Sequence, residues 1–180
     1  MDQTRLLSWF GLGEKEEVDW DRVYATELPR VYNFFRYRVL DRATAEDLTS
    51  TTFEKAWRAR GRYRRDRAHV ETWLLAIARN VAIDHFRSRA RTEVPLELAL
   101  GDHRDTPEES AVRRDELKRL GCLLQGLEER ERELLALKYG AGATNRAIAK
   151  VTGLTESNVG TILFRTISRL RVQWEEGGEP

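Results

Sequence analysis

The chain is poor in cysteine, with Cys122 as the single one among its 180 residues. One thiol cannot form an internal disulfide or a thiolate metal cluster, so a disulfide-stabilised scaffold is excluded. Histidines are also few, and His69, His85 and His103 have no partner at the i, i+4 spacing of a helical metal site. We therefore expect no metal and no other cofactor. Cys122 lies among leucines and is expected to be a small buried hydrophobic side chain.

Long apolar runs are absent as well. Charged residues make up 34% of the chain, and no window approaches the roughly 20 uninterrupted apolar residues that a membrane-spanning helix needs. The N-terminal segment mixes Trp9 and Phe10 with charged residues from Glu14 to Asp19, which is not the pattern of a secretory signal. We expect a cytoplasmic protein without a membrane span.

The charge is unevenly distributed, although the net charge is only +1. Residues 20–92 carry 16 basic and 9 acidic side chains, residues 93–112 carry 1 and 6, and residues 113–180 carry 12 and 10. Two basic segments with an acidic break between them indicate two folded units and a polyanionic partner for at least one of them. A solvated, arginine-rich surface is the alternative explanation.

Apolar residues recur at helical spacing on both sides of the acidic break. In residues 28–39 and 70–81 they fall at i, i+3, i+4, i+7 and i+11, which puts them on one stripe of a helix, and another helix is expected from about Ala43 to Ala59. Trp57 and Trp73 lie on these stripes and are expected in the core. Helical spacing resumes at Leu117, and no segment alternates like a strand. The sequence predicts an all-α fold.

The loss of periodicity after Arg91 sets the predicted domain boundaries. Residues 92–111 contain two prolines, a glycine and several acidic side chains, a composition typical of a flexible linker. We therefore predict two small helical domains joined by a flexible acidic linker. The boundaries are an N-terminal extension at 1–19, a first domain at 20–92, the linker at 93–111, a second domain at 112–174 and a tail at 175–180.

Residues 144–171, TNRAIAKVTGLTESNVGTILFRTISRLR, are typical of a helix-turn-helix. A short apolar face around Ile148 is followed by Gly153 for the turn and by Thr155 as the N-cap of a longer helix. A second helix of this kind enters the major groove, where small polar side chains reach base edges and arginine contacts phosphate or guanine. An ordinary helical hairpin would explain the apolar positions equally well, but five basic residues against one acidic residue favour DNA. The outer face of the second helix carries Ser157, Asn158, Thr161, Arg165 and Arg169.

Six of the ten residues from Arg58 to Arg67 are arginine, and Tyr63 lies among them. A ring inside a basic loop suits single-stranded nucleic acid, because the guanidiniums attract the backbone and a base can stack on the ring. The alternative is a solvated loop whose Tyr63 packs on the core. The following helix adds Arg79 and Asn80 on its polar side. One unit suited to duplex DNA and another suited to unpaired bases would together serve strand opening.

The order of these motifs resembles an extracytoplasmic-function sigma factor, a member of the sigma-70 family of bacterial RNA polymerase. The resemblance covers residues 20–172 and includes AEDLTSTTFEKAW, the arginine loop, ETWLLAIARNVAIDHFRSRAR, the linker with TPEES and the helix-turn-helix. It implies a non-enzymatic initiation factor in the bacterial cytoplasm, with residues 20–92 similar to sigma region 2 and residues 112–174 similar to region 4. Its partners would be core RNA polymerase, promoter DNA as duplex and as non-template single strand, and an anti-sigma protein, with no small-molecule substrate.

The resemblance also implies roles for single residues. Asp47 and Leu48, together with Thr51, match the helix that docks on the coiled coil of the polymerase's largest subunit. The second helix of the helix-turn-helix would read the minus-35 element through Ser157, Asn158, Thr161, Phe164, Arg165 and Arg169. The unpaired strand at the minus-10 element would be bound by Arg58, Arg60, Arg62, Tyr63, Arg64, Arg65, Arg79 and Asn80.

Two other functions fit parts of this pattern. A helix-turn-helix regulator would bind its operator without polymerase, but the arginine loop with Tyr63 counts against that reading. A nucleic-acid-processing enzyme would need a nucleophile motif or a cluster of carboxylates, and the adjacent Asp84 and His85 point in different directions on a helix. We expect no enzymatic activity.

Overall fold

The computed structural model describes residues 18–89, 116 and 118–176. Within these ranges the chain forms helices and turns without a strand, so the predicted all-α fold is confirmed. The predicted linker, almost all of the N-terminal extension and the end of the tail lie outside the described residues. No helix in the described ranges is long and apolar enough to span a membrane.

The N-terminal unit consists of three long helices. Asp19 caps the first helix by accepting a hydrogen bond from the Arg22 N–H at 3.0 Å, and Leu40 ends that helix in the left-handed conformation, with φ of 58°. Asp41 then caps the second helix through the Thr44 N–H at 2.7 Å. The elements are α2 (Trp20–Val39), α3 (Arg42–Ala59), the short 3-10 turn η1 (Arg60–Arg62) and α4 (Val70–Arg89).

The C-terminal unit contains the predicted helix-turn-helix. Thr144 caps the shorter helix, Gly153 makes the turn with φ of 77°, and the Thr155 hydroxyl accepts the Asn158 N–H at 3.2 Å at the start of the longer helix. Residues 118–125 are also helical. The named elements are α6 (Glu129–Leu135), its continuation as a single π turn, η2 (Ala136–Gly140), α7 (Asn145–Thr152) and α8 (Glu156–Glu176).

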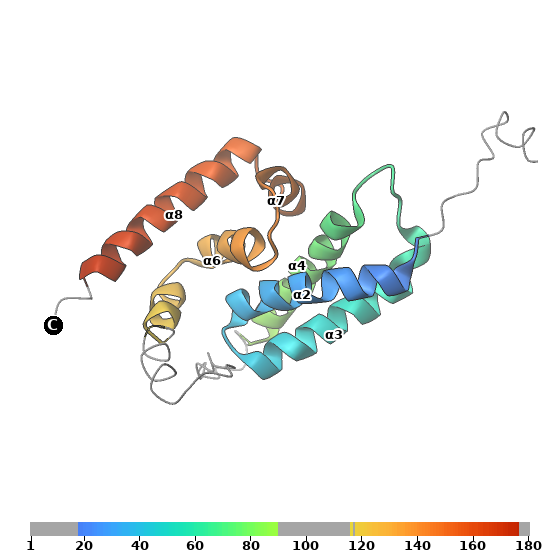
Figure 1. Ribbon diagram of the computed structural model, residues 1–180, viewed down its shortest axis with the longest axis horizontal. Coiled ribbons are helices and arrows are strands. Elements are labelled where there is room, and N and C mark those ends of the chain that lie inside the picture. Colours follow the sequence, from blue (N-terminus) through green and yellow to red (C-terminus); the bar gives the residue numbers. More distant parts are fainter. Residues whose placement is uncertain (1–17, 90–115, 117, 177–180) are drawn as a thin grey trace, which may run out of the picture.

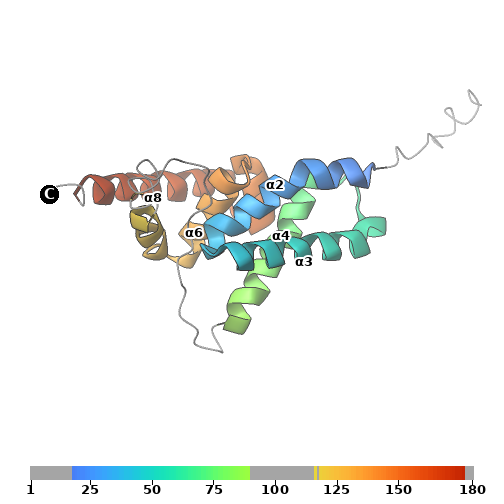
Figure 2. The ribbon, with the colours of Figure 1, turned by 60° about the horizontal axis from the view of Figure 1, so that its bottom comes forward.

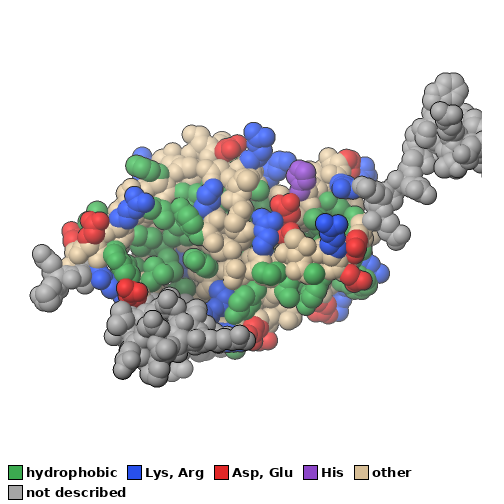
Figure 3. All heavy atoms as spheres, viewed as in Figure 1, with side chains coloured by type: hydrophobic (Ala, Val, Ile, Leu, Met, Phe, Trp, Pro, Cys, Tyr) green, Lys and Arg blue, Asp and Glu red, His purple; other side chains and the backbone are tan. Residues whose placement is uncertain are grey.

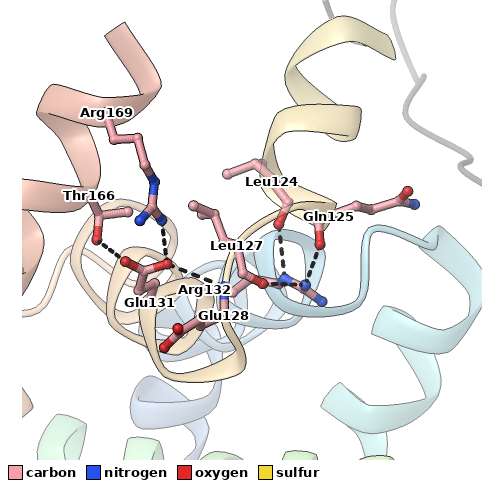
Figure 4. Close-up of polar contacts among 8 residues, drawn as sticks. All are labelled: Leu124, Gln125, Leu127, Glu128, Glu131, Arg132, Thr166 and Arg169. Carbon is pink, nitrogen blue, oxygen red and sulfur yellow. Dashed lines mark hydrogen bonds and ion pairs between the residues drawn. The ribbon is translucent and has the colours of Figure 1, made fainter. Parts of the chain in front are cut away.

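Two adjacent side chains hold this unit together (Figure 4). The half-buried Arg132 donates to the carbonyl oxygens of Leu124, Gln125 and Leu127 at 2.9–3.0 Å, and so satisfies the end of the helix before α6. Glu131 accepts hydrogen bonds from Thr166 and Arg169, which ties α6 to α8. The orientation of α8 is therefore fixed by polar contacts as well as by its apolar stripe.

The two units pack against each other and share one buried cluster. Val31, Phe34 and Phe35 of α2 and Leu134 and Leu137 of the α6–η2 segment are all fully buried in it. Each such side chain contributes on the order of 1.5–3 kcal/mol by leaving water. The cluster is built where α2 meets α6 and η2 and where α4 meets α7. In Figures 1 and 2, α8 lies on the side of the C-terminal unit that faces away from α2 to α4.

Two predictions about single side chains were wrong. Trp57 is 53% exposed, because the buried stripe of α3 runs through Ala45, Leu48, Thr52 and Ala56, and position 57 is turned about 100° away from it. Cys122 is exposed for the same reason, since its helix buries Gly121 and Leu124 instead.

Candidate nucleic-acid interface

Tyr63 anchors the arginine loop to the N-terminal unit. Its ring centre lies 5.9 Å from that of Trp20 and 5.2 Å from that of Trp73, and its hydroxyl donates to the Ala68 carbonyl oxygen at 3.0 Å. Burial raises the pKa of Tyr63, so the phenol remains a neutral donor. The half-buried ring holds the loop in one place against the start of α2 and α4.

A cavity of about 330 Å³ lies beside Tyr63, between the first turns of α2 and the arginine loop. Its lining contains charges of both signs and the edge of the aromatic cluster. A space of this kind accommodates a small planar group with polar edges. The residues that shape it include Asp19, Arg22, Glu27, Tyr63, Arg65 and Val70.

The arginines of the loop make weak, replaceable contacts. Arg64 donates two hydrogen bonds to Asp66, at 3.0 and 3.1 Å, and these bonds hold the pKa of Asp66 below its usual range. Arg58 pairs with Glu54 one helical turn away. All four side chains are exposed, and water and salt screen such pairs, so they contribute little to stability. A phosphate chain can therefore replace these carboxylates at little cost.

Exposed aromatic surface lies next to the loop. The Arg60 guanidinium covers the Trp57 ring at 3.9 Å and donates to the Trp57 carbonyl oxygen at 2.7 Å. Tyr24 is 50% exposed, and its ring contacts that of Phe53 at 4.7 Å beside an apolar hollow of about 240 Å³. Bases stack on such rings. Sequence reasoning missed this surface because it assigned Trp57 to the core and did not pair Tyr24 with α3.

The two polar residues predicted on α4 lie in different surroundings. Asn80 is exposed. Arg79 is half-buried and faces the C-terminal unit, with its Nε 3.0 Å from a carboxylate oxygen of Glu133. The structure therefore gathers Tyr63 and the loop arginines at one end of the N-terminal unit, while Arg79 is engaged elsewhere.

The second helix of the helix-turn-helix presents a polar face to solvent. Val159, Leu163 and Thr166 are buried, and the side chains between them point outward. Phe164 is 74% exposed, an unusual position for a phenylalanine that nothing covers among the described residues. The exposed residues of the predicted minus-35 set are Ser157, Asn158, Thr161, Phe164, Arg165 and Arg169.

Arg169 differs from the other members of that set. Arg169 pairs with Glu131. Burial acts to raise the pKa of the Glu131 carboxyl, but hydrogen bonds from Arg169, the Glu128 N–H and Thr166 outweigh it, so the pKa of Glu131 is lowered. This pairing makes Arg169 part of the support of α8. On the face shown in Figure 3, basic and acidic side chains are interspersed, and hydrophobic side chains gather between α8 and α6.

The predicted polymerase-binding residues lie on α3. Asp47 is exposed, and the Thr51 hydroxyl donates to the Asp47 carbonyl oxygen at 2.9 Å. Leu48 is 8% exposed and packs in the core. A partner on this face of α3 would therefore contact Asp47 and Thr51, while the buried Leu48 packs α3 against the core.

Among the described residues, no group of three histidine, cysteine or carboxylate side chains is arranged to hold a metal ion. The groups that these surfaces offer are arginines, amides, hydroxyls and aromatic rings. Such groups bind nucleic acid through charge, hydrogen bonds and stacking.

Comparison with known proteins matches both units. The family model for Sigma-70 region 2 matches residues 23–92, and that for Sigma-70, region 4 matches residues 117–170. The chain is 30% identical over 176 residues to the ECF RNA polymerase sigma factor BldN of Streptomyces coelicolor, covering 94% of this chain and 66% of BldN. It is 34% identical over 153 residues to the probable RNA polymerase sigma-C factor of Mycobacterium bovis, covering 83% of this chain and 78% of that protein.

A solved structure has the same fold. The sigma factor RpoE in complex with the anti-sigma factor NepR, from Bartonella quintana, superposes with a TM-score of 0.72 at 21% sequence identity. The superposition covers 87% of this chain and 97% of RpoE. Both units of the fold described above therefore have a counterpart in an experimental structure.

Proposed function

The chain belongs to the extracytoplasmic-function sigma factors of the sigma-70 family, and we propose how its two units share the work of promoter recognition and strand opening. As a member of this family it is an alternative sigma factor that acts with core RNA polymerase in transcription initiation. In our proposal, residues 20–92 bind polymerase and the unpaired minus-10 strand, and residues 112–174 read the minus-35 duplex. The acidic segment 93–111 joins them.

The observation that carries this proposal is the pairing of two different DNA-binding surfaces in one small chain. One is a capped, outward-facing recognition helix, and the other is an arginine loop anchored by Tyr63 beside exposed rings. Flipping a base out of the duplex costs a few kcal/mol, and stacking and charge contacts on the second surface would offset that cost. In this proposal the protein acts by binding alone and performs no catalytic step.

The remaining roles follow from the family. Asp47 and Thr51 on α3 would contact the polymerase's largest subunit, with Leu48 holding the helix in place. The protein would work in the bacterial cytoplasm, where core polymerase is found. An anti-sigma partner, which the resemblance implies, stays a prediction.

Purified core polymerase tests the proposal directly. The chain should co-elute with core enzyme and direct run-off transcription from a subset of genomic fragments that core enzyme alone does not transcribe. Tight, specific binding to a DNA fragment without polymerase, together with no co-elution, would replace the proposal with a helix-turn-helix regulator.

A further inference from the structure

Phe164 is the most exposed large hydrophobic side chain among the described residues, with 74% of its surface accessible. It lies on α8, the second helix of the helix-turn-helix. Exposure alone does not make a binding site. The position of this ring on α8, its surroundings and its chemistry together indicate what covers it.

The ring lies on the outward stripe of α8. Positions i, i+4, i+7 and i+11 of this stripe hold Ser157, Thr161, Phe164 and Ser168. Val159 and Leu163, which are buried, lie on the side of the helix that faces the rest of the C-terminal unit. A recognition helix that enters the major groove with its outward stripe brings the Phe164 ring to the edges of the bases.

The fold keeps α8 from rolling over to bury the ring. Thr166 and Arg169 of α8 both donate to Glu131 of α6, and Figure 4 shows the two side chains converging on that carboxylate. Val159 is fully buried on the inner side of the helix. The direction in which Phe164 points is therefore set by contacts elsewhere on α8.

The chemistry of the ring selects one group in the major groove. A phenyl ring has no hydrogen-bonding atom to pair with the acceptors of guanine or with the amino groups of adenine and cytosine. Among the groups that the four standard bases present in this groove, the 5-methyl group of thymine is the apolar one. Contact with phenylalanine covers both apolar surfaces.

Gly160 leaves room for a base edge beside the ring. A helical side chain leans toward the N-terminus of its helix, so the Phe164 ring lies over the turn that contains Gly160. A Cβ at this position would lie 3.7 Å from the Asn145 Nδ2, an ordinary contact, so packing does not require a glycine there. Glycine weakens a helix relative to alanine. Its presence here leaves the backbone open to a base.

The surroundings of the ring favour DNA over a protein partner. A protein partner would be expected to meet a broader apolar patch. The neighbours of Phe164 on the outer face are the hydroxyls of Ser157, Thr161 and Ser168 and the exposed guanidinium of Arg165. Hydroxyls and arginines are the groups that contact phosphates and base edges.

Resting on the proposed function, we propose that Phe164 is a specificity-determining residue: its ring, beside the open backbone of Gly160, contacts the 5-methyl group of a thymine in the upstream promoter element. The contact favours thymine over each of the other bases at that position. It adds an apolar readout to the polar contacts of the same helix.

Selection from a randomised DNA duplex library finds the position that is read. The full-length protein, alone and in complex with core polymerase, should enrich thymine at one or more positions. Phe164→Ala should lose that preference and keep the preferences at the other positions. Because the ring is exposed, circular dichroism and the thermal midpoint should be the same in the variant as in the wild type.

Replacing the selected thymine by deoxyuridine removes the methyl group alone. The wild type should bind the thymine duplex about fourfold more tightly than the deoxyuridine duplex in fluorescence anisotropy, the effect of one methyl group leaving water. Phe164→Ala should bind the two duplexes equally. Gly160→Ala should bring the ratio closer to one, because its added methyl group takes up the room beside the ring.

Val172→Ala is the matched control. Val172 is 51% exposed on the same helix, two turns further along and outside the predicted minus-35 set. Its removal takes away an exposed apolar side chain of α8 without touching the proposed contact. The fourfold ratio between the thymine and deoxyuridine duplexes should therefore stay as in the wild type.

Equal affinity of the wild type for the two duplexes, or an unchanged ratio in Phe164→Ala, would overturn the proposal. Loss of co-elution with core polymerase in Phe164→Ala, with the ratio intact, would assign the ring to a protein partner instead. An unchanged ratio in Gly160→Ala would remove Gly160 from the contact. A chain that distinguishes thymine from deoxyuridine without co-eluting with core enzyme would contradict the proposed function and support this inference.

Discussion

Single side chains of the N-terminal unit carry the most direct tests of strand binding. Asn80 is exposed on α4, and its side chain supports no contact that the fold needs among those described. Asn80→Ala should therefore reduce open-complex formation, measured by permanganate reactivity of unpaired thymines, while the affinity for core polymerase stays the same. Equal loss of both activities would remove Asn80 from the strand-binding surface.

Asp41 is a residue whose contribution to stability depends on pH. The hydrogen bonds from Thr44 to its carboxylate at the start of α3 hold the pKa of Asp41 below its usual range. A carboxylate with a lowered pKa in the folded state stabilises the fold above its ordinary pKa of about 3.9, and this stabilisation is lost as the pH falls through the lowered value. Asp41→Ala should reduce the free energy of unfolding by about 1 kcal/mol at neutral pH.

Urea unfolding measured over a range of pH checks this prediction. The difference between Asp41→Ala and the wild type should shrink as the solution becomes more acidic than the ordinary carboxylate pKa. Asp41→Asn, which keeps a capping oxygen, should retain most of the stability at neutral pH, and its difference from Asp41→Ala should not change with pH because neither variant carries the titrating carboxylate. A difference between Asp41→Ala and the wild type that is constant with pH would contradict the assigned cap.

At the scale of single residues, helix caps and turns could be predicted from the sequence better than the direction in which a side chain points. Thr155 caps α8 through its hydroxyl and Gly153 makes the turn through its backbone, both within a few residues of chain, and both are found as expected. Trp57 and Cys122 depend on which side of a helix is buried, and an error of one position moves a side chain by about 100°. Arg79 is of a residue type expected at a DNA contact, and only the fold shows that Glu133 lies beside it.

At the scale of the element, α8 offers a comparison between two arginines on one helix. Arg165 is exposed, whereas Arg169 is paired with Glu131. Arg165→Ala should weaken binding to a minus-35 duplex and lower the slope of log K against log salt concentration by about 1. The measurement is fluorescence anisotropy of the polymerase-bound protein with labelled duplex, over a range of salt concentrations.

Arg171→Ala provides the control, since Arg171 is exposed further along the same helix and outside the predicted set. It should bind the duplex with nearly the wild-type salt dependence. If Arg165→Ala behaves like Arg171→Ala, α8 does not use Arg165 to contact DNA.

The helices themselves were predictable because each buries a regular stripe. α4 starts where the stripe at 70–81 starts, and α3 begins within one residue of the predicted position. α2 is longer than its stripe, because Asp19 caps it well before the first apolar residue of the pattern. The π turn η2 was not predictable, since the apolar spacing does not distinguish it from an α-helix, and the close approach of Gly140 to α2 involves residues far apart in the chain.

At the scale of the whole molecule, charge is nearly balanced but unevenly placed. The net charge is +1 at pH 7, while residues 20–92 carry 16 basic and 9 acidic side chains and residues 93–112 carry 1 and 6. Such a chain has little net repulsion between molecules and complementary segments that attract. We expect light scattering by the free protein to be highest near neutral pH in low salt and to fall as salt is added. Scattering that increases with salt would indicate apolar association instead.

The packing of one unit on the other could not be predicted from the sequence. Arg38 and Glu133 are charged residues, and such residues are ordinarily solvated. Both are buried where the two units pack on each other, and this packing depends on surfaces that are far apart in the chain. The boundaries predicted for the two domains stay a prediction.

The position of Cys122 has a practical consequence. It is the only thiol in the chain, and it is exposed on the C-terminal unit. A maleimide dye will therefore attach at one known place in the wild-type sequence, with no cysteine to remove first. The same accessibility means that preparations left without a reducing agent will accumulate cross-linked pairs of molecules.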